Sequence, residues 1–125
     1  MSLPSSFTCF WRRPCVVEWY GTANNAAINS GGVQYVYGTC NSATINSGGV
    51  QFVYSGATAN NTAISNLGLQ VVEGTAHNTA INGGVEWIHG GLANNVTFTG
   101  TDSTLELDKP SQLTGTITNW QIGDR

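Results

Sequence analysis

Apolar residues recur along most of the chain at an interval of about 17 residues, without the 3.6-residue period of an amphipathic helix. Cutting before each apolar-Gln pair or its equivalent gives five segments that begin at residues 16, 33, 50, 69 and 85. Their lengths are 17, 17, 19, 16 and 17 residues, and the differences fall around 55–59 and Gly83. Constant apolar positions with variable connections are typical of stacked repeats. The pattern therefore predicts one structural unit repeated over 16–101.

Four columns of the aligned repeats are expected to be buried because they are apolar in nearly every segment. Two of them are Val16, Val33, Val50, Leu69, Val85 and Trp19, Val36, Val53, Val72, Ile88. The other two are separated by two residues, and so share one strand face: Ala26, Ala43, Thr62, Thr79, Val96 and Ile28, Ile45, Ile64, Ile81, Phe98. Gly-Gly or an equivalent closes each repeat, and Gly38, Gly74 and Gly90 open a middle turn where positive φ is expected. Each repeat is predicted to hold two short strands and two turns.

A unit of this size cannot bury an apolar face alone, but parallel stacking at roughly 4.8 Å joins each column into a continuous ladder. The expected fold is all-β, a single-stranded parallel β-helix or solenoid of right-handed sense with about five rungs. Rung-to-rung hydrogen bonds between turn amides are expected in the columns Asn29, Asn46, Ser65, Asn82, Thr99 and Asn25, Ser42, Asn61, Asn78, Asn95.

The ends of the chain differ in composition from the repeats, which suggests three parts. Residues 1–15 are expected to be a leader or cap, 16–101 the solenoid, and 102–125 capping strands or the start of a truncated continuation. In the last part, Pro110 marks a turn, and the residues expected to face inward are Leu105, Leu107, Leu113 and Ile117.

Charged residues make up only 9% of the chain, against about 25% in a typical soluble domain. The basic residues are Arg12, Arg13, Lys109 and Arg125, so no positive side chain lies between residues 14 and 108. Nucleic acid and anionic membranes need clustered Lys or Arg and are excluded as expected partners. No apolar run approaches the roughly 20 residues of a membrane span, so direct membrane insertion is not expected.

The cysteines and the N-terminal segment carry little functional information. Cys9, Cys15 and Cys40 are odd in number and lack the CxxC spacing of a zinc or redox site, and three free thiols are favoured over a bridge between Cys9 and Cys15. Residues 1–15 lack a basic start followed by an apolar segment, so any export signal is expected to lie outside this chain.

The segment GGVQYVYGTCNSATINSGGVQFV, residues 31–53, resembles the repeat of the AIDA-type self-associating autotransporter adhesins, whose pattern reads GGxQxVxxGGxAxxTxIxxGGxQxV. The matching residues are Gly31, Gly32, Gln34, Val36, Gly38, Ile45, Gly48, Gly49, Gln51 and Val53, and the register recurs through residue 98. The chain departs from the pattern at the middle turn, where Gly-Thr replaces Gly-Gly in three repeats, and at Val17 and Glu86, which replace glutamine. The tail 103–124 is similar to segments that close such arrays in large secreted bacterial proteins. The resemblance implies a secreted or surface-displayed passenger that mediates adhesion or cell-to-cell aggregation.

One column varies between charged and aromatic residues, which a packed interior would not tolerate, and it is therefore expected to face outward: Glu18, Tyr35, Phe52, Val71 and Trp87. Beside it run Tyr20, Tyr37, Tyr54, Glu73 and His89. Aromatic residues are enriched at binding surfaces, so the candidate binding residues are Tyr35, Tyr37, Phe52, Tyr54 and Trp87. In the alternative, the rings only stabilise the ladder or are covered by residues 1–15. The expected partner is a second copy or another cell-surface molecule, either protein or glycan, and unpaired terminal strands also allow end-to-end association.

Other functions find less support in the sequence. The carboxylates Glu18, Glu73 and Glu86 fall in three different columns, which argues against a polysaccharide-active enzyme. His77 and His89 have no second ligand at matching spacing, and the acidic group at 102–108 is expected to be a solvated cap strand, so neither a metal nor a cofactor is expected. An ice-binding array would need more threonine than the outward column Ala27, Thr44, Ala63, Ala80, Thr97 offers. A purely structural spacer stalk stays open as the alternative to an adhesin.

Overall fold

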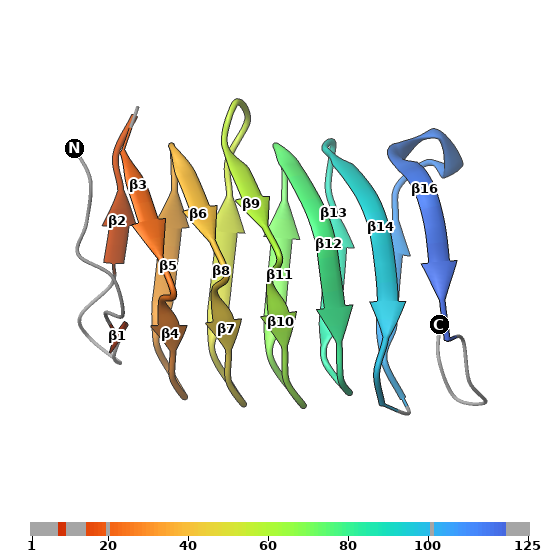
Figure 1. The fold of residues 1–125 in the computed structure, drawn as a ribbon, viewed down its shortest axis with the longest axis horizontal. Helices are drawn as coiled ribbons and strands as arrows, with labels where there is room; N and C mark the ends of the chain where they lie inside the picture. Colours follow the sequence, from red (N-terminus) through yellow and green to blue (C-terminus); the bar gives the residue numbers. More distant parts are fainter. Residues whose placement is uncertain (1–7, 10–14, 20, 101, 120–125) are drawn as a thin grey trace.

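The computed structural model of the chain describes residues 8–9, 15–19, 21–100 and 102–119. It is a parallel β-solenoid in which each rung stacks on the preceding one, from the N-terminal β2 to the C-terminal β15 and β16 (Figure 1). The fold class predicted from the sequence is confirmed. In the described part of the chain the only helical segment is a single 3-10 turn, η1 (Pro110–Gln112), at the turn that Pro110 was predicted to mark.

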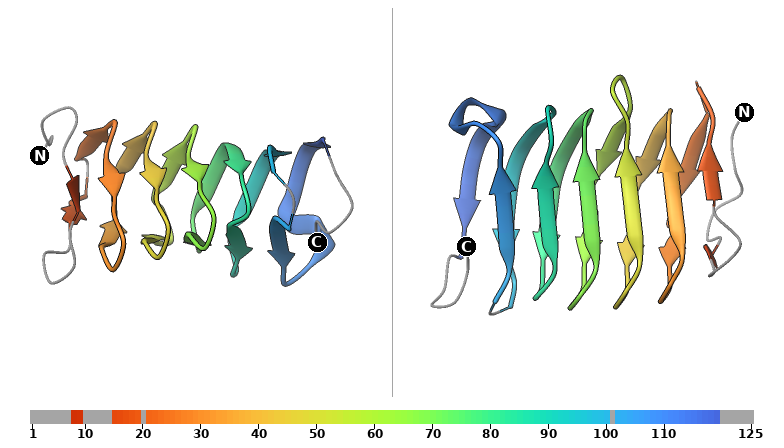
Figure 2. Two further views of the ribbon diagram at one scale, coloured as in Figure 1. Left: turned by 90° about the horizontal axis from the view of Figure 1, so that it is seen from below. Right: turned by 180° about the vertical axis from the view of Figure 1, so that it is seen from behind.

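The first sheet contains one strand from each of six rungs, and all of its pairs are parallel. Its strands are β2 (Cys15–Val17), β5 (Val33–Val36), β8 (Val50–Val53), β11 (Leu69–Val72), β13 (Val85–Ile88) and β15 (Thr104–Leu107). Figure 2 shows this sheet and the second sheet as opposite walls of the stack.

The second sheet receives two short strands from each of the first three repeats, so the expectation of two strands per repeat is wrong for these three and correct for the fourth and fifth. The pairs of strands are β3 (Thr22–Asn24) and β4 (Ala27–Ile28), β6 (Thr39–Asn41) and β7 (Thr44–Ile45), β9 (Thr58–Asn60) and β10 (Ala63–Ile64). In later rungs the two strands merge into β12 (Thr75–Ile81) and β14 (Leu92–Phe98), and β16 (Leu113–Thr118) follows β14, while β1 (Thr8–Cys9) pairs with β4. The corner within each rung is one residue with positive φ, between 56° and 63°: Asn25, Ser42, Asn61, Asn78 or Asn95.

The core is formed by three inner columns of the second sheet and one column of the first sheet. One column of the second sheet was not predicted: Ala23, Cys40, Ala59, Ala76 and Ala93. The alanine-rich and isoleucine-rich columns from Ala26 to Val96 and from Ile28 to Phe98 are buried, as predicted. Val36, Val53, Val72 and Ile88 are also buried, but Val17 rather than Trp19 completes their column, because β2 places Val17 opposite Val36. Trp19 lies in the following turn, with 59% of its surface exposed, so its predicted burial is wrong.

The column from Val33 to Val85 does not face the core, contrary to the prediction. Side chains of a strand alternate between its two faces, so Val33 and Val36, three residues apart, point to opposite sides. Val33, Val50, Leu69 and Val85 are half-buried, and Val16 is 40% exposed and lies opposite Tyr35. The inward position next to each of the four is polar and fully buried: Gln34, Gln51, Gln70 and Glu86.

The buried glutamines form a hydrogen-bonded ladder along the solenoid axis. Gln51 Nε2 donates to Gln34 Oε1 at 2.7 Å, and Gln70 Nε2 donates to Gln51 Oε1 at 2.7 Å. A buried amide without such a partner would destabilise the fold by roughly 1 to 3 kcal/mol. The glutamine of the repeat pattern therefore has a structural role inside the solenoid.

The turns between the two sheets alternate in length, which shapes one edge of the molecule. The turns 37–38 and 73–74 are short, whereas 18–21, 54–57, 89–91 and 108–112 are longer. At the short turns glycine is needed for close approach rather than for positive φ, which corrects the expected reason. A Cβ on Gly74 would lie 2.3 Å from the carbonyl oxygen of Ala57, and a Cβ on Gly38 would lie 2.3 Å from the carbonyl oxygen of Gly21. Of the three glycines predicted to have positive φ, only Gly90 has it, at +81°.

The cysteines also differ from expectation. Cys15 is disulfide-bonded, so the chain does not hold three free thiols. Cys40 is a buried free thiol whose pKa is raised by desolvation to about 11. The side chain of Cys9 and most of the expected leader 1–15 lie outside the described residues.

In the last rung Leu105, Leu107 and Leu113 pack against the core as predicted, whereas Ile117 is 37% exposed rather than inward. No helix in the described part of the chain is long and apolar enough to cross a membrane.

Candidate contact surface

Four aromatic side chains on the outer side of the first sheet form a continuous group, which we call the aromatic strip: Tyr35, Tyr37, Phe52 and Tyr54. They come from β5, β8 and the turns that follow these strands. Tyr35 stacks on Phe52 with ring centroids 5.7 Å apart and planes at 8°, and Tyr37 stacks on Tyr54 at 4.7 Å and 14°. Because adjacent rungs are in register, identical positions bring ring on ring.

The stacking determines which part of each ring faces solvent. Near-parallel rings on successive rungs cover one another's faces, so the ring edges of these half-buried side chains are the parts left for contact. Desolvation, the neighbouring Tyr37 and Tyr35 and the Glu73 carboxylate raise the pKa of Tyr54. Its phenol therefore stays neutral at physiological pH and can both donate and accept a hydrogen bond.

The strip ends at the fourth rung and is shorter than the sequence suggested. Val71 is only 7% exposed and Glu73 is an exposed carboxylate, so no ring continues the stack there. Trp87 lies one rung further on, in contact with His89 at a centroid distance of 4.6 Å and a tilt of 44°. The structure thus brings four of the five candidate binding residues together and places Trp87 apart.

The N-terminal end of the strip also differs from expectation. The register of β2 moves Glu18 out of the aromatic column and into the turn 18–21, while Tyr20 lies outside the described residues. Trp19, which was expected in the core, instead contacts Tyr37 with centroids 6.3 Å apart and a tilt of 41°. An exposed tryptophan that was predicted to be buried therefore lies beside the aromatic strip.

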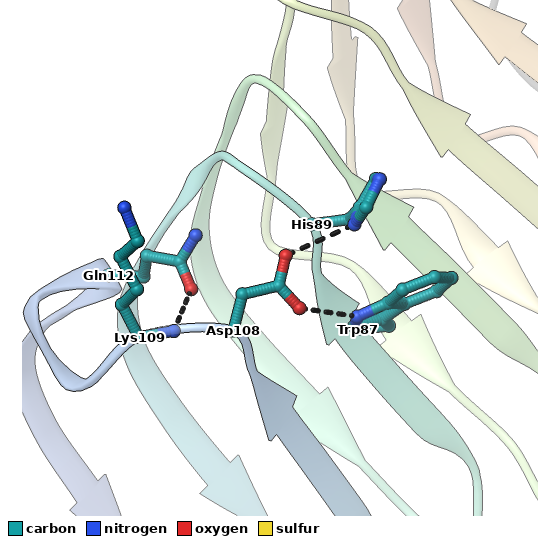
Figure 3. Close-up of polar contacts among 5 residues, drawn as sticks. All are labelled: Trp87, His89, Asp108, Lys109 and Gln112. Atoms are coloured by element: carbon teal, nitrogen blue, oxygen red, sulfur yellow. Dashed lines mark hydrogen bonds and ion pairs between the residues drawn. The ribbon is translucent and has the colours of Figure 1, made fainter.

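Trp87 is fixed by a polar cluster that the sequence analysis missed (Figure 3). Asp108, directly after β15, accepts a hydrogen bond from Trp87 Nε1 at 3.2 Å and lies 3.1 Å from His89 Nδ1. One residue later, the backbone N–H of Lys109 donates to Gln112 Oε1 at 2.7 Å. His89 was predicted to be a surface histidine and Asp108 part of an acidic, solvated cap strand, because only the stacking of the sixth rung on the fifth brings them together.

The carboxylates of the repeats lie in different environments. Glu86 is fully buried, accepts a hydrogen bond from Thr79 Oγ1 at 3.0 Å, and has a pKa that desolvation raises to about 7 against the smaller opposing effect of that bond. Glu18 and Glu73 are exposed turn residues on different rungs. Among the described residues, no three His, Cys, Asp or Glu side chains gather in a way that would hold a metal ion.

Comparison with known proteins agrees with this architecture. No family model matches the chain, and no curated protein matches it. Among solved structures, the chain resembles the passenger of an AIDA-type autotransporter adhesin, and it is thus an adhesin-like β-solenoid. The structure concerned is the 55–350 fragment of TibA, hyper-glycosylated by TibC.

The likeness to the TibA fragment extends along nearly the whole of this chain. The TM-score is 0.77 at 28% sequence identity, and the match covers 98% of this chain and 48% of the other. The chain therefore spans about half the length of the TibA fragment. The resemblance to AIDA-type repeats noted in the sequence is confirmed.

Proposed function

We propose that this chain is a non-catalytic passenger segment, secreted or displayed on a bacterial surface, which mediates self-association through the aromatic strip and Trp87. The observation that carries the proposal is the row of stacked, half-buried rings on the outer face of the first sheet. Rings held by their neighbours lose little conformational entropy on binding and bury much area, which suits them to a contact surface. The likeness to an adhesin passenger supports this assignment.

A second copy is the partner that this surface fits best. Two strips related by a twofold axis would bring the same rung spacing face to face, so the ring edges of one copy could contact those of the other along several rungs. The phenol hydroxyls of Tyr35, Tyr37 and Tyr54 supply both donors and acceptors for such a contact. No cofactor is needed for it.

Sedimentation at a series of concentrations tests the proposal. Replacing Tyr37, Tyr54 and Trp87 by serine is expected to weaken self-association at least about tenfold, because the loss of three large rings removes most of the buried contact area. The β signal in circular dichroism should stay unchanged, since these side chains lie outside the core.

A matched control introduces three serines on the opposite wall. Thr44→Ser, Ala63→Ser and Thr97→Ser change three half-buried, outward positions of the second sheet and should leave association as it is. Equal association of the aromatic variant and the native chain would contradict the proposed surface. A monomer in every case would instead favour the alternative, a structural spacer of a larger secreted protein.

A further inference from the structure

An open groove of about 620 Å³ crosses the turn edge of the solenoid at the short turn 73–74. The longer turn 54–57 bounds it on one side, and 89–91 and 108–112, with η1, bound it on the other. In Figure 1 the β8–β9 turn and the segment before β16 project beyond the neighbouring turns at this edge. The alternation of short and long turns therefore creates a recess whose floor is the fourth rung.

Glycines form much of the floor of this groove. A Cβ on Gly74 would lie 2.3 Å from the Ala57 carbonyl oxygen, and a Cβ on Gly91 would lie 2.3 Å from that of Gly74, so only glycine fits the spacing of these turns. Above Gly90 there is open space, with no atom within 4 Å of a Cβ placed there. Backbone therefore forms much of the groove wall at these glycines, and Thr75 and Leu92 also line the groove.

The equivalent recess two rungs earlier already holds an aromatic ring. Trp19 extends from the turn 18–21 over the short turn 37–38, where it contacts Tyr37. It also reaches the next long turn, because a Cβ on Gly56 would lie 3.4 Å from Trp19 Cζ3 and 3.6 Å from Cη2. No described side chain takes the corresponding place above Gly74, so the second recess offers room for a ring-sized group.

The rim of the groove carries hydrogen-bonding groups of every kind. Glu73 and Asp108 contribute carboxylates, Lys109 an ammonium and Ser111 a hydroxyl, while the Oε1 of the buried Gln112 is occupied by the Lys109 N–H. A pyranose ring has a flat C–H face that suits a glycine floor, and hydroxyls that donate to carboxylates and accept from amide or ammonium groups. Two carboxylates against one lysine disfavour an anionic ligand, and the volume lies in the range of small-ligand sites.

We propose that the groove over Gly74 binds a short neutral saccharide, with Glu73 and Asp108 accepting hydrogen bonds from its hydroxyls. Asp108 is already oriented by Trp87 and His89, so its carboxylate is held in place at the end of the groove. The groove lies at the turn edge rather than on the aromatic strip, and it meets the proposed self-association surface where Asp108 is bonded to Trp87. It gives the solenoid a second contact of a different chemical class.

Amide NMR of the nitrogen-labelled full chain tests the site directly. Maltose, cellobiose, lactose and melibiose, each titrated to about 50 mM, serve as neutral probes over the affinity range of weak saccharide binding. We expect at least one of them to shift the amide signals of Gly74, Gly90 and Gly91 in a saturable manner. The amide of Gly38, under Trp19, should not respond.

Variants then separate the groove from other surfaces. Glu73→Gln and Asp108→Asn are each expected to weaken binding at least about tenfold, whereas Glu106→Gln, an exposed carboxyl outside the groove, should not. Ser111→Trp fills the groove from an exposed position and should abolish binding with circular dichroism unchanged. Absence of saturable shifts at the three glycines with all four sugars, or shifts confined to the aromatic strip, would overturn the proposal. Sedimentation of Ser111→Trp should equal that of the native chain, so this result is distinguishable from a failure of self-association.

Discussion

Glu86 occupies the position on the fifth rung that glutamine holds on the three rungs before it. In the ladder Gln51 and Gln70 each donate from Nε2 to Oε1 of the preceding glutamine, and Gln70 lies in register with Glu86. Among the described residues, neither Gln70 Oε1 nor Glu86 Oε1 has a hydrogen-bond partner, although both are buried. Two acceptor oxygens side by side repel each other. A protonated Glu86 instead carries a hydroxyl that can donate a hydrogen bond to Gln70 Oε1, which extends the ladder.

This arrangement predicts a stability that falls as the pH rises. Desolvation raises the pKa of Glu86 from 4.5 to about 7 in the folded chain, so between these values the folded state holds a proton that the unfolded state releases. The contribution is fully present below pH 4.5 and is lost as the pH passes through about 7, with a size of roughly 3 kcal/mol. The free energy of unfolding from urea titrations at pH 5 and pH 8 measures it.

Glu86→Gln provides the matched comparison, because it restores the ladder without a titrating group. The variant should be more stable than the native chain at pH 8 and should lose this part of the pH dependence. Other titrating groups are common to both chains and cancel in the difference. Parallel pH profiles for the two chains would show that Glu86 is ionised in the folded state and that the ladder does not select its protonated form.

At the scale of the secondary-structure elements, the corner between the two strands of a rung depends on one residue in the left-handed region. Asparagine holds this position in four rungs at φ between 57° and 63°, while Ser42 holds it at 56° in the second. Asparagine adopts this conformation more readily than most residues with a Cβ. Repetition of asparagine in this column is therefore explained mainly by the backbone.

Replacing Ser42 by asparagine should therefore stabilise the chain. We expect a gain of about 0.5 to 1 kcal/mol in the free energy of unfolding, in the range found when a residue is matched to its backbone conformation. Thermal unfolding followed by circular dichroism measures the change. Ser47→Asn, at an exposed turn residue without positive φ, is the control and should have little effect. Equal shifts in both variants would attribute the gain to composition rather than to the corner.

The corner also shows what the sequence could and could not predict. The column of Asn25 and Asn78 was correctly placed at a turn, but was interpreted as an amide ladder, and one bond of this kind is found, from Asn95 to Asn78 at 3.3 Å. Shorter bonds join the adjacent column, from Asn41 to Asn24 at 3.0 Å. A residue type that recurs in one column of the repeats shows that the position is constrained. It does not show whether the constraint comes from a side-chain contact or from the backbone conformation.

Register and stacking explain the remaining differences. The two residues that lengthen the turn 18–21 leave the repeat length unchanged, so the sequence alone could not exclude Trp19 from the core column. The aromatic strip was predictable because it lies in two columns of adjacent repeats. The cluster of Asp108 with Trp87 was not, because the sixth rung departs from the repeat pattern and its stacking had to be known first.

For the molecule as a whole, the last rung protects the edges of the rungs before it. In a solenoid each rung contacts mainly its neighbours, so a terminal rung with unpaired strands is a site for addition of another chain. Here β15 pairs with β13 and β16 pairs with β14, and Leu105 and Leu107 pack against the core. These strands cover Ile88 and Phe98, which are fully buried.

Removal of residues 102–125 should therefore promote aggregation by edge pairing. The shortened chain would leave β13 and β14 as open edges next to uncovered core side chains, and light scattering should report particles larger than the native species at equal concentration. Thr97→Lys in the shortened chain distinguishes edge pairing from unfolding, because Thr97 faces outward on the new edge strand, where a lysine disfavours pairing. We expect this variant to scatter less than the shortened chain while keeping the β signal in circular dichroism. A shortened chain that matches the native species in size would show that the terminal rung does not protect the edge. Equal scattering with and without the lysine would indicate that unfolding, rather than strand addition, causes the aggregation.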